Sequence, residues 1–97
     1  MKNKVYKNEL DFLQDKFIED KESMNETELL ALVLSDAESA RKIITKYSSF
    51  YGMANQPLED FTHFKGMGDG KVLRLAATFE IALRISMKRE EIQEAGR

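Results

Sequence analysis

The sequence contains no cysteine, one proline, five glycines and a single histidine among its 97 residues. Without cysteine there is no disulfide, no thiolate nucleophile and no structural zinc site of the usual kind. His63 alone cannot build a multi-histidine metal site. No nucleophile–base pair or metal-ligating arrangement is visible, so we expect neither an enzyme nor a bound cofactor or metal.

Long apolar runs are also missing. The longest covers residues 29–34, far short of the ~20 residues that span a bilayer. No signal peptide is visible, because acidic residues rather than an apolar stretch follow residues 1–7. We therefore expect a cytoplasmic protein of one domain that does not contact a membrane.

Neither sign of charge dominates the chain, which has 15 Lys and Arg against 17 Asp and Glu, a net charge of −2 at pH 7. Non-specific nucleic-acid binders usually carry a net basic surface, because much of their affinity comes from neutralising phosphates. The overall charge therefore counts against strong nucleic-acid binding. Any such binding must come from a local site.

The scarcity of proline and glycine, with apolar residues repeating at helical spacing, predicts an all-α fold, a compact bundle of about five helices. In residues 1–24, an amphipathic helix places Tyr6, Leu10, Leu13 and Phe17 on one side. We expect this side to pack on the rest of the domain. The alternative is a face that binds a partner protein or a second copy of the chain.

Residues typical of helix N-termini divide residues 25–88 into further helices. We expect these residues to form one domain, the helix-hairpin-helix domain described below. Asn25 and Glu28, three places apart, have the form of a capping box at a helix start. Asp36 repeats the capping pattern almost at once and predicts a sharp break before a second helix over about Ala37–Tyr47. The two helices would form a helical hairpin.

Glycine and proline mark the next boundaries. Gly52 is expected to end the preceding helix in a left-handed conformation, with a short turn around residues 53 and 54. Pro57 suits the first position of another helix. The longest helix is expected over about Lys71–Lys88, and apolar positions nearly encircle it, which is typical of a central helix contacted on several sides. Residues 89–97 form a polar tail that we expect to fray.

The sharpest local signal is the Gly66-Met67-Gly68 turn before that helix. Two glycines give access to backbone conformations closed to other residues, and we expect a positive φ at Gly68. Met67 would point inward and hold the turn on the core. The exposed N–H groups and the helix start beyond them form an anion site suited to phosphate. The candidate phosphate-binding residues are Lys65, Gly66, Met67, Gly68, Gly70 and Lys71.

This stretch resembles a helix-hairpin-helix motif, the non-sequence-specific DNA-binding unit of many repair proteins. Apolar residues at positions 61, 64, 67, 72 and 75 surround the two glycines at the spacing of that family. Asp69 departs from the usual Pro, Ala or Lys and brings a negative charge beside the candidate phosphate. Gly70 weakens the start of the second helix.

Over residues 26–88 the order of motifs resembles the N-terminal region of RadC-type DNA repair proteins, a bacterial family. The likeness covers Glu28–Leu34, Ala40–Ile44, Tyr47–Phe50, Leu58–Phe61, Lys65–Gly68 and Ala76–Arg84. The loop that follows the first of these in the family is reduced here to Ser35-Asp36. Family members continue into a metal-dependent, peptidase-like domain, which nothing in this chain matches. The resemblance implies a weak, non-specific DNA-binding module of a repair-associated protein.

The residues leave two other interpretations of the turn open. It is a purely structural hairpin in a protein-interaction or dimerisation module, or it binds another anionic ligand. On the DNA-binding interpretation, Lys71→Glu removes DNA binding and leaves folding nearly unchanged, whereas Gly68→Val damages the turn itself. His63, within one turn of the hairpin, is expected to be an exposed helix residue.

Overall fold

Every regular element of the computed structural model, which describes residues 5–96, is a helix. In chain order the elements are α1 (Glu9–Asp20), the 3-10 helix η1 (Lys21–Ser23), α2 (Glu26–Leu34), α3 (Ala37–Tyr47), α4 (Phe50–Ala54), α5 (Leu58–Phe61) and α6 (Asp69–Ala95). The all-α class is therefore confirmed. None of these helices is both long and apolar enough to cross a membrane.

Side chains at the helix starts explain why the chain divides where it does. Asn8, Asn25, Asp36 and Ser49 each accept a hydrogen bond from the backbone N–H three residues further on, at the starts of α1, α2, α3 and α4. Such caps satisfy N–H groups that have no partner within the helix. At α2 the Asn25 N–H also donates to the Glu28 carboxylate, 3.0 Å away. The predicted capping box is confirmed.

The predicted boundary at Gly52 is wrong. Ser48 takes the positive φ of 75° at the end of α3, and Gly52 lies inside α4, where a turn was expected. A Cβ atom at Gly52 would run into the carbonyl oxygen of Tyr47, so the glycine serves a close approach of two backbone segments. Pro57 is also displaced by one position, because it precedes α5 as an extended residue with φ −61° and ψ 146°.

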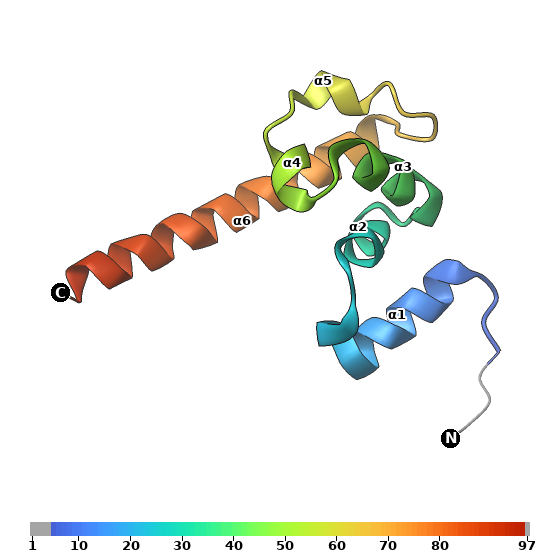
Figure 1. Ribbon diagram of the computed structural model, residues 1–97, viewed down its shortest axis with the longest axis horizontal. Coiled ribbons are helices and arrows are strands. Elements are labelled where there is room, and N and C mark those ends of the chain that lie inside the picture. The colour runs from blue at the N-terminus through green and yellow to red at the C-terminus, as the bar shows by residue number, and fades with distance from the viewer. Residues whose placement is uncertain (1–4, 97) are drawn as a thin grey trace.

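The core lies where α2 packs against α3 and against the first turns of α6 (Figure 1). Residues from every α-helix contribute to it, including the short α4 and α5. Its twelve buried apolar residues are Leu13, Met24, Leu30, Ala31, Leu34, Ala40, Ile43, Met53, Phe61, Met67, Val72 and Leu75. We call α1–α5 together with the first three turns of α6 the body.

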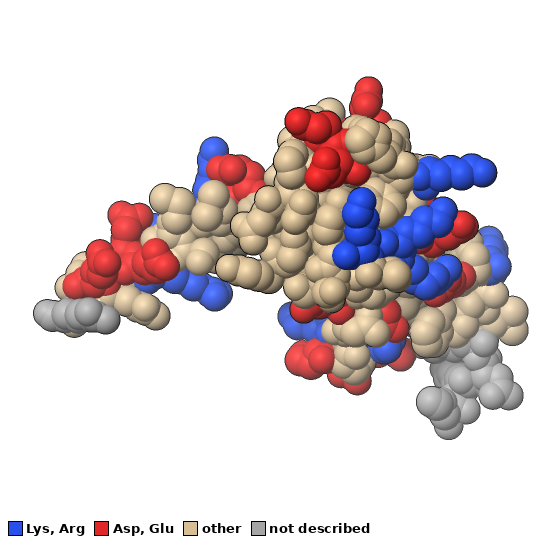
Figure 2. Space-filling view, turned by 45° about the horizontal axis from the view of Figure 1, so that its top comes forward, with Lys and Arg blue, Asp and Glu red and all other residues tan. Residues whose placement is uncertain are grey.

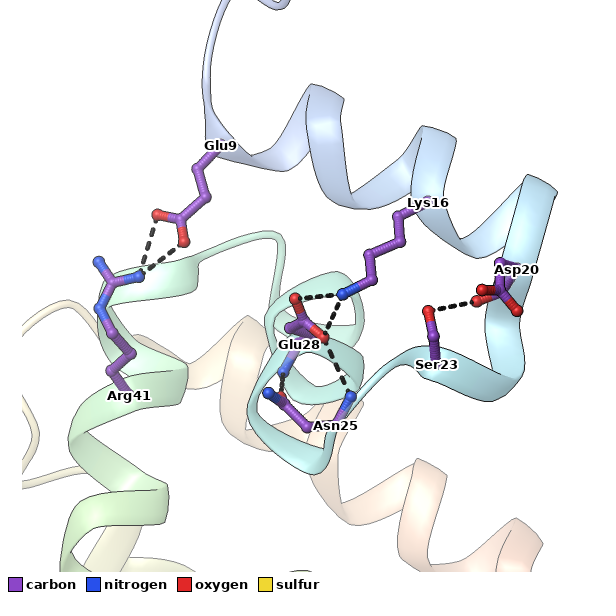
Figure 3. Close-up of polar contacts among 7 residues, drawn as sticks. All are labelled: Glu9, Lys16, Asp20, Ser23, Asn25, Glu28 and Arg41. Carbon is purple, nitrogen blue, oxygen red and sulfur yellow. Dashed lines mark hydrogen bonds and ion pairs between the residues drawn. The ribbon is translucent and has the colours of Figure 1, made fainter. Parts of the chain in front are cut away.

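Helix α1 is attached to the rest of the body by one buried side chain and, among the described residues, by the two ion pairs drawn in Figure 3. Leu13 is buried in the core. The ammonium nitrogen of Lys16 lies 3.0 Å from the Glu28 carboxylate on α2, and Arg41 on α3 lies 2.8 Å from Glu9. The Arg41–Glu9 pair is half exposed and adds little stability, so the attachment depends mainly on Leu13 and on the less exposed Lys16–Glu28 pair.

The central position expected for the longest helix is wrong. Only Val72 and Leu75 of α6 are buried, and every residue from 80 to 96 is exposed. The polar tail expected over residues 89–97 instead continues the helix as far as Ala95. Figure 1 shows α6 leaving the body and extending away from all other helices. Its apolar side chains have no layer of helices around them.

Candidate nucleic-acid interface

The segment between α5 and α6 folds as a tight turn held on the core by one methionine. The Met67 side chain is 6% exposed, as predicted, and its backbone N–H donates to the carbonyl of Phe64 over 3.1 Å. Gly66 has a φ of +94°. A Cβ atom there would lie 3.1 Å from the Ser39 hydroxyl, so both the backbone conformation and the neighbouring helix favour glycine.

Gly68 does not have the positive φ that the sequence suggested. It is the N-cap of α6, with φ −83° and ψ 175°, an extended conformation open to any residue. No side chain caps this helix. The N–H groups of Lys71 and Val72 both donate to the Gly68 carbonyl. The N–H groups of Asp69 and Gly70 thus belong to an exposed, uncapped helix start.

Lys71 does not extend toward solvent as a free phosphate contact. Its ammonium group donates to the Asp36 carboxylate over 2.7 Å and to the carbonyl oxygen of Gly66 over 2.9 Å. Both charged side chains are less than one third exposed. Lys71 therefore ties the start of α6 to the glycine turn and to the N-cap of α3, 35 positions away in the sequence.

Asp36 is the centre of this arrangement. Burial alone would raise its pKa, but hydrogen bonds from Lys71, from the Ser39 hydroxyl at 2.7 Å and from the Ser39 backbone N–H at 3.0 Å outweigh it. The pKa of the Asp36 carboxyl is therefore held well below its usual range. A charged Asp36 neutralises most of the positive field that Lys71 would otherwise offer to a phosphate.

The remaining charges near the turn are mixed. Lys65 is exposed, and the ammonium group of Lys46 lies 5.7 Å from the ring centre of Phe64. Arg74 donates to the carbonyl of Val33 over 3.2 Å. Asp69 stands exposed in the first turn of α6. Figure 2 shows blue side chains gathered where α3 and the segment before α6 lie, with red ones among them.

Four of the six predicted residues lie in the turn, and Gly70 and Lys71 lie in the first turn of α6, so their environments differ. Gly68 and Gly70 are exposed at the helix start, and Lys65 is exposed before it. Met67 is buried, and Lys71 is hydrogen-bonded to Asp36. His63 is exposed in a turn after α5 rather than in a helix. Within residues 5–96, no three His, Asp or Glu side chains come together as a metal site.

Two features were not predicted from the sequence. Asp36 was predicted only as the cap of a helix start and Ser39 was not singled out, and nothing in the sequence links either residue to a lysine 35 positions away from Asp36. The second feature is an open apolar cleft of about 540 Å³ beside the part of α6 where the helix leaves the body. Its lining residues are Leu29, Leu30, Val33, Phe50, Tyr51, Ala54, Leu75, Thr78, Phe79 and Ala82.

Comparison of the chain with protein-family models, with curated proteins and with solved structures finds no match in any of the three. The roles of the residues are therefore argued from their own geometry.

Proposed function

We propose that this chain is a DNA-contacting module of the helix-hairpin-helix type, which holds backbone phosphates at the start of α6. The observation that carries this proposal is the uncapped N-terminus of a long helix, placed behind a left-handed glycine turn. Backbone N–H groups at such a point attract anions. The resemblance of residues 26–88 to the N-terminal region of RadC-type DNA repair proteins supports the same proposal.

In this mechanism the N–H groups of Asp69 and Gly70 bind a phosphate oxygen, and the exposed Lys65 adds a charged contact. Lys71 fixes the turn through Asp36 instead of touching the phosphate. Contacts to the phosphate backbone carry no sequence information, so binding is independent of sequence. With few cations available and Asp69 nearby, we expect a dissociation constant on the order of 10⁻⁴–10⁻⁶ M at physiological salt.

Gly68→Asp tests the proposal directly. The site of a Cβ atom at Gly68 has no other atom within 4 Å, so an aspartate fits without displacing anything. Its carboxylate would cap the first turn of α6 and occupy the place of the phosphate, changing stability by only a few tenths of a kcal/mol. We expect DNA binding to be lost and the melting temperature to be kept.

Fluorescence anisotropy with a mixed-sequence duplex, at two salt concentrations, measures this effect. Gly68→Ala is the matched control, since it leaves the N–H groups free and should bind like the wild type. Equal binding by the wild type and Gly68→Asp would refute a phosphate site at the helix start. So would a wild type that binds no duplex at low salt.

Lys71→Glu does not separate DNA binding from folding, as the sequence suggested it would. The substitution would place a carboxylate against Asp36 and remove the hydrogen bond to Gly66, so it should lower stability as well as any DNA binding. Lys65→Glu reverses an exposed charge beside the turn without breaking a contact to Asp36. Lys21→Glu, on the exposed η1, is its control for net charge.

A second candidate function, a protein-interaction module, is favoured by the apolar cleft. Where α6 leaves the body, Figure 2 shows a broad surface free of charged side chains. Exposed apolar surface of this kind marks interaction sites in many proteins. A wild type that self-associates but binds no duplex would favour this candidate over DNA contact.

A further inference from the structure

The free part of α6 carries a stripe of three isoleucines. Ile81, Ile85 and Ile92 are 61%, 50% and 61% exposed. At about 100° per residue they share one side of the helix, roughly 130° round from the side that carries Val72, Leu75 and Phe79 into the body. We call these three residues the isoleucine stripe. It does not continue the core.

The helix itself needs a partner along this stretch. All residues from 80 to 96 are exposed, which amounts to more than four turns with no side chain buried in the body. An isolated helix of this length is marginal in water, and isoleucine is a weaker helix former than leucine or alanine. Covering the stripe would stabilise the helix and remove apolar surface from water at the same time.

The stripe belongs to a regular repeat. Positions alternate at spacings of three and four along the outer side of α6, the pattern of the a and d positions of a coiled coil. The positions in this repeat are Thr78, Ile81, Ile85, Lys88, Ile92 and Ala95. The first of them, Thr78, lines the apolar cleft, so the repeat begins at the edge of the body.

We propose that a second copy of this chain covers the stripe, with the two α6 helices packed antiparallel. In that register Ile81 lies against the partner's Ile92, and Ile85 lies beside the aliphatic stem of the partner's Lys88. Beside the line of contact between the two helices, which we call the seam, Arg84 lies next to the partner's Glu91. Two-fold symmetry forms each of these contacts twice.

Charge selects the orientation. A parallel pair would place Lys88 on the partner's Lys88 in the seam, and Arg84 beside the partner's Arg89 on its flank. Both contacts bring like charges together, whereas the antiparallel pair brings Arg84 to an acid. The antiparallel pair also separates the two bodies. Phe79 is the last residue of α6 that packs on the body, and at 1.5 Å per residue the two copies of Phe79 lie about 22 Å apart along the helix axis.

This inference rests on the second candidate function and is independent of DNA contact. Its test is the mass in solution by sedimentation equilibrium, from about 5 µM to about 1 mM protein. We expect the wild type to approach twice its chain mass of 11.2 kDa. Ile81→Glu should raise the dissociation constant of the dimer roughly tenfold to a hundredfold, because it places a charge against the partner's Ile92 where an apolar side chain packed.

Met87→Glu is the matched control, since Met87 is 55% exposed on the same helix but faces away from the stripe. It should dimerise like the wild type. Circular dichroism and the melting temperature at low concentration check that every variant is folded. A wild type that stays monomeric at about 1 mM, or equal effects of Ile81→Glu and Met87→Glu, would overturn the proposal.

Charge exchange tests the orientation. Arg84→Glu should weaken the antiparallel dimer, and the double variant Arg84→Glu with Glu91→Arg should restore it, although the exposed Glu80–Arg84 pair is lost in both. In a parallel dimer Arg84→Glu would instead meet the partner's Arg89 and tighten association. Tighter association of Arg84→Glu, or no rescue by the double variant, would refute the antiparallel arrangement.

Discussion

Lys71 shows how the role of one residue depends on neighbours that are distant in the sequence. A lysine at a helix start after a glycine turn suggests a phosphate contact, and its position in the structure agrees with that pattern. The Asp36 carboxylate lies 2.7 Å from the Lys71 ammonium group and forms an ion pair with it, so the positive charge of Lys71 is already neutralised. The backbone of the turn is thereby fixed, while the contribution of Lys71 to any phosphate site becomes indirect.

The Asp36–Lys71 pair predicts loss of stability in acid. The pKa of Asp36 is lowered in the folded chain relative to about 3.9 in the unfolded one, so its contribution is complete above that value and is lost as the pH falls below it. The hydrogen bond from the Asn25 N–H, together with Lys16, lowers the pKa of Glu28 against a smaller effect of burial, and this adds to the trend.

Asp36→Asn should lower the free energy of unfolding by about 1–3 kcal/mol at pH 7 and flatten its fall below pH ~4. Urea unfolding at several pH values measures both effects. Asp69→Asn, at the exposed start of α6, is the control and should leave stability nearly unchanged. A wild-type pH profile that Asp36→Asn leaves unaltered would show that the pair has no such role.

The two glycines of the turn should respond differently to alanine. Gly66 has φ +94° and faces the Ser39 hydroxyl, so Gly66→Ala should cost about 1–3 kcal/mol of stability. Gly68 has an extended backbone and open space around it, so Gly68→Ala should lose only the preference of an N-cap for glycine over alanine, a smaller loss than at Gly66. Thermal unfolding of the two variants side by side measures the difference. Equal losses would contradict the assignment of the left-handed position to Gly66.

At the scale of the elements, the start of α2 and both ends of α3 (Ala37–Tyr47) were predicted, whereas the residue that takes the left-handed conformation after α3 was not. A start is marked by a side chain that caps its own helix, as at Asn25 and Asp36, and this signal lies within three residues. An end is decided by which residue takes the left-handed conformation. Ser48 takes it although Gly52 is available, because Gly52 is needed where α4 passes the Tyr47 carbonyl.

Two serines in left-handed conformations offer a test of these helix ends. Ser35 ends α2 with φ 54° and Ser48 ends α3 with φ 75°. Glycine is preferred at such positions, because it adopts a positive φ without the steric cost of a side chain. Ser35→Gly and Ser48→Gly should each raise the free energy of unfolding by about 0.5–1 kcal/mol.

Thr45→Gly, at an exposed position inside α3, is the control for the helical interior and should lower stability. Urea denaturation of the three variants distinguishes the two kinds of site. If the glycines at positions 35 and 48 destabilise as much as the one at position 45, the two serines do not occupy strained conformations.

At the scale of the whole molecule, the all-α class followed from composition and helical spacing, but the place of α6 did not. Apolar residues on nearly all sides of a helix are typical of a helix surrounded by others. Here the body covers only the first three turns. Of the remaining apolar residues, Ala82 lines the cleft, whereas the isoleucine stripe, Leu83 and Met87 are exposed. The positions of apolar residues show which side of a helix is buried. They do not show whether it is buried against the same chain or against another molecule.

The same division predicts two zones of stability within α6. Amides of residues 72–79 belong to turns packed on the core and should exchange with solvent only as the body unfolds, whereas amides of residues 87–95 open with the free helix. Hydrogen exchange followed by mass spectrometry at low micromolar protein should find strong protection in the first segment and little in the second. If a second copy covers the isoleucine stripe, raising the protein concentration should protect residues 87–95 in the wild type but not in Ile81→Glu. Slow exchange of residues 87–95 at the lowest concentration, equal to that of residues 72–79, would mean that the body itself supports the end of the helix.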